Sequence, residues 1–278
     1  MVSKASRSLL VILAVLTTLP VLAPVSGGSA SSMRTSAESP RQHPPMKFHR
    51  FRADGTVESE NWSGYAVTGS SFKFAIGSWT VPPVDCSASG GTPNSYAAFW
   101  VGIDGYSSNT VEQIGTDSDC NGTTPDYYAW YEFYPKFSVN ITSVAVSVGD
   151  HMSAEVTYNG SEFTVTISNE STGSSYSHSQ RVNGAKRTSA EWIAEAPCCT
   201  NKGAVLPLSN FGILSLGSDY TGFPGTNDAT GASASGPISD FGLSVEEIIM
   251  VSAGGAEESV PSGLTSDGSS FQATWKSE

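Results

Sequence analysis

From residue 61 onward the chain alternates apolar and polar residues in short runs, a period of two that is typical of half-buried β-strands. Turn-forming residues separate the runs, and Asn159-Gly160 is a strong signal of a tight hairpin. No stretch shows convincing helical periodicity. The strands predicted in this way are residues 72–81, 96–103, 127–134, 144–148, 154–158, 163–167, 188–195, 245–251 and 271–275.

Many short strands divided by turn residues are typical of an all-β sandwich or barrel. Residues 217–237 are rich in Gly, Ser, Thr and Asp, and we expect them to form a long surface loop. Six Trp, ten Tyr and twelve Phe supply enough apolar volume for a packed core, which argues against intrinsic disorder. We therefore predict one large all-β domain.

The first residues have the order of a signal peptide. Lys4 and Arg7 precede an apolar run over residues 9–25, and small residues follow it. A membrane anchor is the alternative, but the run is slightly short for a span of about 20 residues and contains prolines. We expect residues 1–30 to be removed on export, so that the mature protein is secreted and extracellular.

Residues 31–58 are basic and rich in proline, and they show no alternation. They are either a disordered linker or a cationic pro-segment that precedes a domain over residues 59–278. Seven of the 14 Lys and Arg, but only four of the 26 Asp and Glu, lie in the first 60 residues. The remaining domain is strongly acidic, which argues against binding to nucleic acid. Because the domain has few Lys and Arg, its positive charges repel one another only weakly in acid.

The mature region contains four cysteines, and export favours disulfides among them. The adjacent pair Cys198-Cys199 is expected to bond elsewhere, because a ring between neighbouring cysteines is strained. A zinc site is disfavoured, since there is no CxxC and only His151 and His178 could supply imidazoles. We expect no metal and no cofactor. The four cysteines are Cys86, Cys120, Cys198 and Cys199.

Common hydrolytic motifs such as GxSxG and HExxH are missing. Polar residues instead interrupt the apolar strands. Glu191 and Glu195 lie four residues apart in one strand, hence about 13 Å apart, which is too far for the carboxyl pair of a glycosidase. A buried ionisable group usually needs a partner, so these residues form either structural pairs or a site. The other interrupting residues are Asp104, Gln113 and Glu132.

Five segments carry these residues, in a fixed order: Asn61-Trp62-Ser63-Gly64, Trp100-Val101-Gly102-Ile103-Asp104-Gly105, Gln113-Ile114-Gly115-Thr116-Asp117, Ala129-Trp130-Tyr131-Glu132 and Ala190-Glu191-Trp192-Ile193-Ala194-Glu195. In order and spacing the chain resembles the glutamic peptidases, or eqolisins, from about residue 58 to its end. The cysteine positions depart from the fungal pattern, so the resemblance implies no disulfide pairing.

The resemblance implies a bent sandwich of two antiparallel β-sheets, concanavalin-like or jelly-roll-like, with a concave substrate cleft. It also implies a monomeric, pepstatin-insensitive acid endopeptidase that acts on proteins and peptides. The catalytic glutamine falls on Gln113 and the catalytic glutamate on Glu195, with Glu191 as its rival. The residues expected to line or support the cleft are Trp62, Trp100, Asp104, Asp117 and Glu132.

In the expected mechanism Glu195 activates water and the Gln113 amide stabilises the oxyanion. The basic pro-segment is expected to inhibit the enzyme until acid protonates the carboxylates. Two other functions remain open. One is a secreted, lectin-like binding module without catalysis, and the other is a glycosidase with Glu132 and Glu195 as its acid pair.

Overall fold

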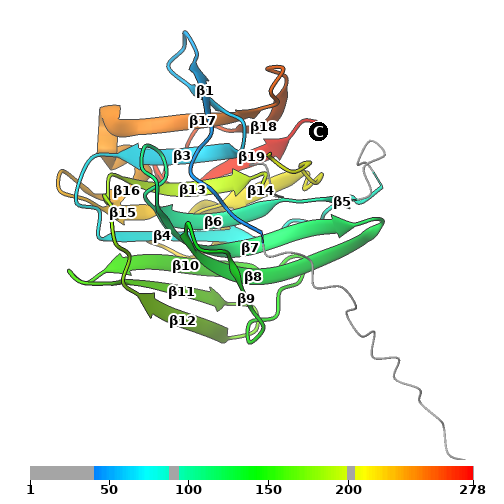
Figure 1. Cartoon of the computed structure of the whole chain (residues 1–278), viewed down its shortest axis with the longest axis horizontal. Helices are drawn as coiled ribbons and strands as arrows, with labels where there is room; N and C mark the ends of the chain where they lie inside the picture. Colours follow the sequence, from blue (N-terminus) through cyan, green and yellow to red (C-terminus); the bar gives the residue numbers. More distant parts are fainter. Residues whose placement is uncertain (1–40, 88–93, 199–203, 278) are drawn as a thin grey trace, which may run out of the picture. The chain divides into compact units, whose positions relative to one another are not determined.

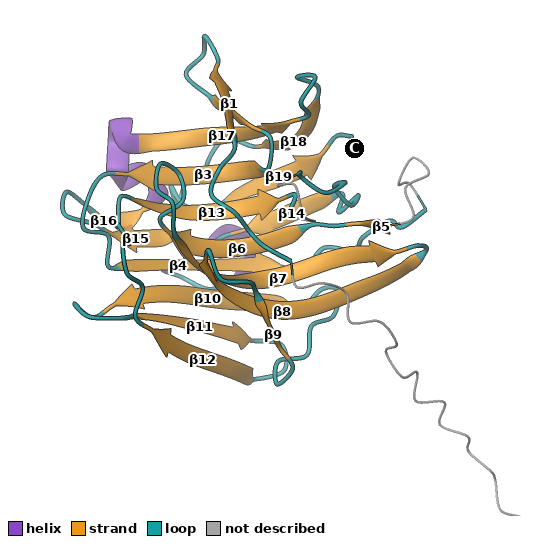
Figure 2. Ribbon diagram, viewed as in Figure 1, coloured by secondary structure: helices purple, strands orange, loops and turns teal. Residues whose placement is uncertain are grey.

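The computed structural model describes residues 41–87, 94–198 and 204–277, so the predicted signal peptide lies outside it. Within these ranges nearly all regular structure is strand (Figure 2). The helices found there are one turn of α-helix, α1 (Ser218–Thr221), and a 3₁₀ segment, η1 (Ile238–Ser244). No helix in these ranges has both the length and the apolar character needed to cross a bilayer. The all-β prediction is confirmed.

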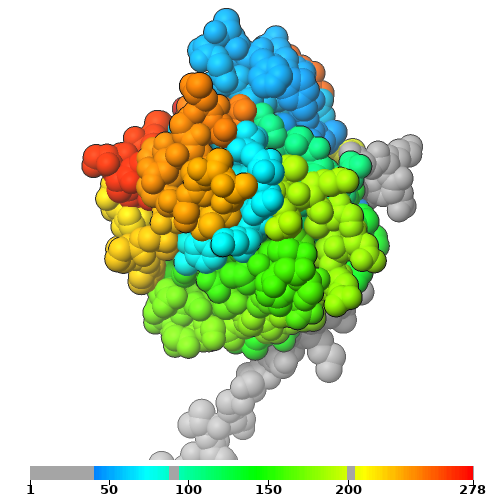
Figure 3. Space-filling model, turned by 90° about the vertical axis from the view of Figure 1, so that its left-hand side faces the viewer, coloured from blue at the N-terminus to red at the C-terminus, as the bar shows by residue number. Residues whose placement is uncertain are grey.

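The first sheet carries the polar residues singled out in the sequence. Its neighbours pair antiparallel, except that β2 and β17 run parallel. At its outer edge β1 (Phe48–Phe51) forms a hairpin with β2, which stands out in blue in the space-filling view (Figure 3). Across the sheet the order is β2 (Val57–Ser59), β17 (Val245–Val251), β3 (Trp62–Thr68), β13 (Ser189–Glu195), β6 (Ala98–Ile103), β7 (Val111–Asn121), β8 (Thr124–Tyr134) and β9 (Val139–Ile141), with β5 (Asn94–Ser95) beside the end of β7.

The second sheet lies against the first and joins it along one edge, where β18 pairs with β17 (Figure 1). Strand β4 is its centre, with β10 on one side and β14 and β15 on the other. The two sheets therefore form a bent sandwich that does not close into a barrel. Its order is β12 (Ser174–Gln180), β11 (Phe163–Asn169), β10 (His151–Tyr158), β4 (Phe74–Thr80), β14 (Ile213–Leu216), β19 (Phe271–Trp275) and β18 (Glu257–Pro261), and β15 (Asp228–Thr230) pairs further with β16 (Ser235–Pro237).

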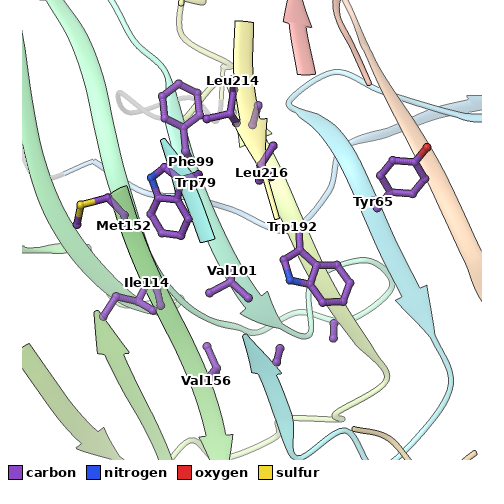
Figure 4. Close-up of a cluster of buried hydrophobic side chains, with 14 of the residues drawn as sticks. Tyr65, Trp79, Phe99, Val101, Ile114, Met152, Val156, Trp192, Leu214 and Leu216 are labelled. Carbon is purple, nitrogen blue, oxygen red and sulfur yellow. The ribbon is translucent and has the colours of Figure 1, made fainter. Parts of the chain in front are cut away.

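The main core fills the space between the sheets with large apolar side chains (Figure 4). Both buried indoles at its centre are hydrogen-bonded, as buried polar groups require. Trp192 Nε1 donates to the Ile76 carbonyl at 2.7 Å, and Trp79 Nε1 donates to Thr116 Oγ1 at 2.9 Å. Burial of these rings fixes how the two sheets stack.

A second apolar cluster lies on the opposite face of the first sheet. It contains Trp62, Trp100 and Trp130, which are all fully buried. Strand alternation explains both clusters, because Phe99 and Val101 of β6 point into the main core while Trp100 points to the other side. The central strands of this sheet are thus covered on both faces, and we call the face that bears the three tryptophans the site face.

Most predicted strands exist, but some elements differ. Residues 144–148 form no strand: Ser147 bonds to Asp150, and the Ala145 carbonyl accepts from Asn169 Nδ2, so these hydrogen bonds do not form a ladder. The predicted loop at 217–237 contains α1, β15 and β16. The Asn159-Gly160 hairpin joins β10 to β11 as expected. Strand β12 is not predicted by the sequence pattern, because it is mainly serine and has no apolar alternation.

Cys86 and Cys120 form a disulfide whose Cα atoms lie 5.4 Å apart. Cys198 is disulfide-bonded as well, and Cys199 lies outside the described residues. The expectation for the adjacent pair Cys198-Cys199 therefore involves a residue outside the described ranges and stays a prediction.

At Gly115 of β7 a side chain would clash with the backbone of the neighbouring strand β6. A Cβ there would lie 2.2 Å from the Phe99 carbonyl oxygen and 2.6 Å from Trp100 Cβ. We predict that Gly115→Ala lowers the free energy of unfolding by about 1–3 kcal/mol, because overpacking forces the two strands apart. Chemical denaturation measures this. Gly254→Ala is the control, since its Cβ would meet only Ser252 Oγ at 3.7 Å; equal losses in both variants would contradict the packing argument.

Candidate active site

Strand register places the candidate residues in rows across the site face. One row contains Glu191 of β13, Gly102 of β6, Gln113 of β7 and Glu132 of β8, each opposite the next. Directly opposed side chains on one face are close neighbours, so Gln113 and Glu132 lie side by side. A Cβ on Gly102 would lie 2.8 Å from the Trp100 ring, which therefore covers the space between Glu191 and Gln113.

A parallel row contains Glu195 of β13, Ala98 of β6, Asp117 of β7 and Tyr128 of β8. Trp100 lies between the two rows, and its Nε1 donates a hydrogen bond to Glu195 Oε2 at 2.8 Å. This bond fixes one carboxyl oxygen of Glu195. Both rows are completely buried apart from Tyr128, which is partly exposed.

Gln113 and Glu195 meet at one residue of the N-terminal segment, His43. Gln113 Nε2 donates to the His43 carbonyl oxygen at 2.6 Å, and Glu195 Oε2 lies 3.1 Å from His43 Nδ1. The His43 backbone N–H donates to Glu132 Oε2 at 2.8 Å. Its ring stacks on Trp130 with centroids 3.6 Å apart and planes 4° from parallel. Three of the five predicted polar side chains of the site, those of Gln113, Glu195 and Glu132, thus hold this single residue.

The residues on either side of His43 are held through their backbone. Gln42 exchanges two backbone hydrogen bonds with Cys198, at 2.8 and 3.0 Å. On the other side, Asn61 Nδ2 donates to the Pro45 carbonyl at 3.3 Å, and the Met46 N–H donates to the Gly105 carbonyl at 3.1 Å. We call residues 41–47 the strap, since they cross the site face in this way.

Arg41 of the strap enters an acidic and aromatic pocket. Its Nη1 donates to Asp117 at 3.3 Å, to Tyr128 Oη at 2.8 Å and to Asp119. Its guanidinium lies over the Tyr96 ring, 4.1 Å from the centroid. Guanidinium groups suit such sites, because they bind carboxylates and also stack on aromatic rings.

Burial dominates the electrostatics of this site. It raises the pKa of Glu195 well above its usual range, and the nearby Glu132 raises it further, against hydrogen bonds that lower it. Burial likewise raises the pKa of Glu132, and it raises that of Asp117 to about 6 although Arg41 lowers it. Burial lowers the pKa of His43 well below its usual range, and Arg41 adds to this. Inside the closed site burial therefore favours the neutral forms of Glu195, Glu132 and His43.

Two predicted residues contribute in other ways. Asp104 has a left-handed φ of 71° and accepts the backbone N–H groups of residues 186, 187 and 188 at 2.7–3.0 Å. It therefore fixes the loop that leads into β13 and supports the site from behind. Glu191 is fully buried beside Asp104 and Glu112, and in the described part of the chain only Glu195 of the two β13 glutamates touches His43.

Sequence reasoning missed the strap and its pocket. His43 and Arg41 were counted only as basic charge, and Asp119 and Tyr128 were not singled out. The signal available was the run Arg41-Gln42-His43-Pro44-Pro45, whose proline pair favours an extended chain. Within the described ranges, no three His, Cys, Asp or Glu side chains are grouped as metal ligands would be.

Comparison with known proteins supplies an independent view. Residues 60–239 match the model of the Peptidase A4 family. The chain is 32% identical to aspergillopepsin-2 of Aspergillus niger over 168 residues, which are 52% of this chain and 60% of that protein. It is 35% identical to scytalidopepsin B of Scytalidium lignicola over 186 residues, 65% of this chain and 68% of that protein.

Two solved structures have a similar fold. A scytalido-glutamic peptidase with a transition-state analogue inhibitor has a TM-score of 0.63 and 24% identity, over 78% of this chain and 98% of that one. The aspergilloglutamic peptidase of Aspergillus niger has a TM-score of 0.54 and 26% identity, over 66% of this chain and 99% of that one.

The buried Glu191 predicts how stability depends on pH. Burial, with Asp104 and Glu112, raises its pKa in the folded protein well above that in the unfolded chain. The stabilisation from its protonated form is full below the unfolded pKa of about 4.3 and is lost as pH rises towards the folded pKa. Because glutamine stays neutral, Glu191→Gln should raise the free energy of unfolding by at least about 1 kcal/mol at about pH 7, and by much less at about pH 3.

Denaturant unfolding at the two pH values tests this, with Glu195→Gln in every protein to prevent self-digestion. Glu170→Gln is the control, since Glu170 is exposed at a turn. If the free energy of unfolding depended on pH in the same way with and without Glu191→Gln, the Glu191 carboxyl would make no pH-dependent contribution to stability.

Proposed function

Since the chain belongs to the Peptidase A4 family, we propose that it is a secreted acid endopeptidase in which Glu195 and Gln113 hydrolyse peptide bonds of proteins. The family match agrees with the resemblance read from the five sequence segments. One observation carries the assignment of residues. Gln113 Nε2 and Glu195 Oε2 both contact His43, a residue of an extended polypeptide, and the Gln113 contact is to its peptide carbonyl oxygen.

The chemistry follows from these two groups. Ionised Glu195 takes a proton from a water molecule, whose oxygen attacks the scissile carbonyl carbon. Gln113 Nε2 donates to the oxygen as it becomes negative, and the amide can do this at any pH because it carries no charge. Glu195 then gives its proton to the leaving nitrogen as the C–N bond breaks. The enzyme forms no covalent intermediate.

The site face supplies the rest of the machinery. Glu132 accepts the N–H of the bound residue, so it binds the backbone of a substrate rather than serving as one of a glycosidase pair. Trp130 and Trp100 form an apolar floor, and Trp100 also orients Glu195. This peptide-binding geometry favours proteolysis over the lectin-like and glycosidase alternatives.

We assign residues 31–58 to a pro-segment that follows a signal peptide of residues 1–30 and precedes the catalytic domain. The strap is its inhibitory part, since it occupies both catalytic side chains. Val57–Ser59 of β2 are buried and paired with β17, whereas residues 53–55 are an exposed turn. The cut that frees the pro-segment is therefore best placed in this turn, a few residues before the boundary suggested by composition.

Acid promotes release of the strap through His43. The free imidazole takes up a proton as pH falls below about 6.5, whereas the buried imidazole, whose pKa is lowered by burial, does not. Docking is therefore strongest above that pH and weakens as the medium becomes acidic. Glu132, Glu195 and Asp117 face the strap from β8, β13 and β7, and protonation of Asp117 also weakens its pair with Arg41.

The dyad predicts the effect of two substitutions on activity. Glu195→Gln and Gln113→Ala should each lower kcat on denatured haemoglobin at about pH 3 by at least about 100-fold, through loss of proton transfer or of oxyanion stabilisation. Glu191→Gln is the matched control from the same strand and should keep more activity than Glu195→Gln. Near-normal activity in a folded Glu195→Gln or Gln113→Ala protein would exclude the dyad, and inhibition by pepstatin would point to an aspartic mechanism.

The pro-segment predicts how the precursor responds to acid. In a Glu195→Gln precursor the chain should stay uncut, and the strap should leave the site as pH falls, which fluorescence of the tryptophans beneath it would report. Adding His43→Gln should move the midpoint of release to lower pH, because the titrating group is removed. An unchanged midpoint would show that His43 does not control release.

A further inference from the structure

The strap lies in the site as a substrate would, although it is an inhibitor. We propose that the His43–Pro44 peptide bond occupies the position of the scissile bond, and that Pro44 is the residue that keeps this bond intact. The inference rests on the proposed peptidase function and deepens it, because it identifies which peptide bonds the enzyme rejects. It concerns the single bond that follows the carbonyl held by Gln113.

The position of the bond follows from the contacts of His43. The carbonyl that accepts from Gln113 Nε2 at 2.6 Å belongs to the peptide bond between His43 and Pro44. In the proposed mechanism the same Gln113 group binds the oxygen of the bond to be cut. The base Glu195 contacts the side chain of this same residue, at 3.1 Å from Nδ1. Gln113 therefore holds the carbonyl of the His43–Pro44 bond, and Glu195 lies beside the side chain of the same residue.

The backbone is held on both sides of that bond. Before it, Gln42 pairs with Cys198 in a two-bond bridge, and the His43 N–H donates to Glu132. After it, Asn61 holds the Pro45 carbonyl and Gly105 accepts from the Met46 N–H. An extended chain bound through alternating backbone groups is how proteins commonly bind peptides. In this arrangement Glu195 Oε2 is occupied by His43 Nδ1 and Trp100 Nε1, and the residue after the carbonyl adds a second, chemical cause that keeps the bond intact.

Proline after the carbonyl supplies that cause. Its nitrogen carries Cδ where other residues carry hydrogen, and it cannot donate a hydrogen bond. Glu195 must deliver a proton to this nitrogen, and the ring hinders its approach and the pyramidal geometry that the nitrogen must adopt. Pro45 restricts Pro44 further to an extended conformation. The strap thus combines the binding contacts of a substrate with a poor leaving group.

Replacing Pro44 should convert the inhibitor into a substrate. In Pro44→Ala, water adds its oxygen to the His43 carbonyl carbon, the C–N bond breaks, and the amine of residue 44 takes the proton from Glu195. The products are one chain that ends in the His43 carboxylate and one that begins at residue 44. We expect this cut to be at least about 100-fold faster than in the wild-type precursor at about pH 4, the size of a proton-transfer contribution.

Pro45→Ala is the matched control. It removes a proline of the same strap but leaves proline after His43, so its precursor should resist cleavage at 43–44 as the wild type does. Purified precursors are brought to about pH 4, an acid medium in which a carboxyl can act first as base and then as acid, and new termini are identified by mass spectrometry. Synthetic peptides of residues 39–50, with the wild-type sequence, with Pro44→Ala or with Pro45→Ala, are then added to the mature enzyme.

Every outcome of these cleavage experiments either supports or overturns the inference. Cleavage at 43–44 in Pro44→Ala, but not in Pro45→Ala or in Pro44→Ala with Glu195→Gln, supports the inference. Equal cleavage of both proline variants, cleavage that persists with Glu195→Gln, or no cleavage at 43–44 in either the precursor or the peptide overturns it. Activity on denatured haemoglobin separates failure of this inference from failure of the proposed function. A mature enzyme that is active but leaves the Pro44→Ala strap intact contradicts only this inference, whereas an inactive mature enzyme contradicts the proposed function.

Discussion

Buried carboxyl groups are the constraint on which the rest of the structure depends. The site face of the first sheet carries Glu132, Glu191, Glu195 and Asp117 with no exposed surface. An ionised carboxylate in such a place is costly unless it is paired or protonated. The lysine and arginine ion pairs found between described residues all take their cation from residues 41–52. Among the described residues, the N-terminal segment therefore supplies the cation that pairs with the buried Asp117.

That dependence links stability to activation. At neutral pH the strap brings Arg41 to Asp117 and Asp119, and the β1–β2 hairpin brings Arg50 and Arg52 to the buried Glu58, at 2.6 and 2.7 Å. Once the segment leaves, protons are the remaining means of neutralising these groups. Acid supplies those protons and is also the condition under which a carboxyl can serve first as base and then as acid. In the proposed activation, the same chemistry keeps the precursor closed at neutral pH and suits the freed domain to acid.

The sequence predicted what depends on local pattern. Alternation placed β4, β6, β8, β10, β11, β13, β17 and β19, because residues at every second position face one side of a sheet. It missed β7, since this strand carries Gln113 and Asp117 on the site face and Glu112 and Thr116 on the other, so neither side reads as apolar. Thr116 is tolerated because the Trp79 indole hydrogen-bonds to it. The resemblance to glutamic peptidases recovered this strand's role where alternation could not.

The position of the strap could not be read from local pattern, because it depends on contacts between residues far apart in the chain. His43 meets Glu195 across 152 positions, and Arg41 meets Asp119 across 78. Composition showed only that a basic segment precedes an acidic domain, which fits many orientations. Backbone contacts select one of these orientations. Gln113 donates to a carbonyl and Glu132 accepts from an N–H, so both bind the segment only where one residue presents both groups to them. Charge attracts the segment to the site, and these directional hydrogen bonds determine which peptide bond meets the two groups to which we assign catalysis.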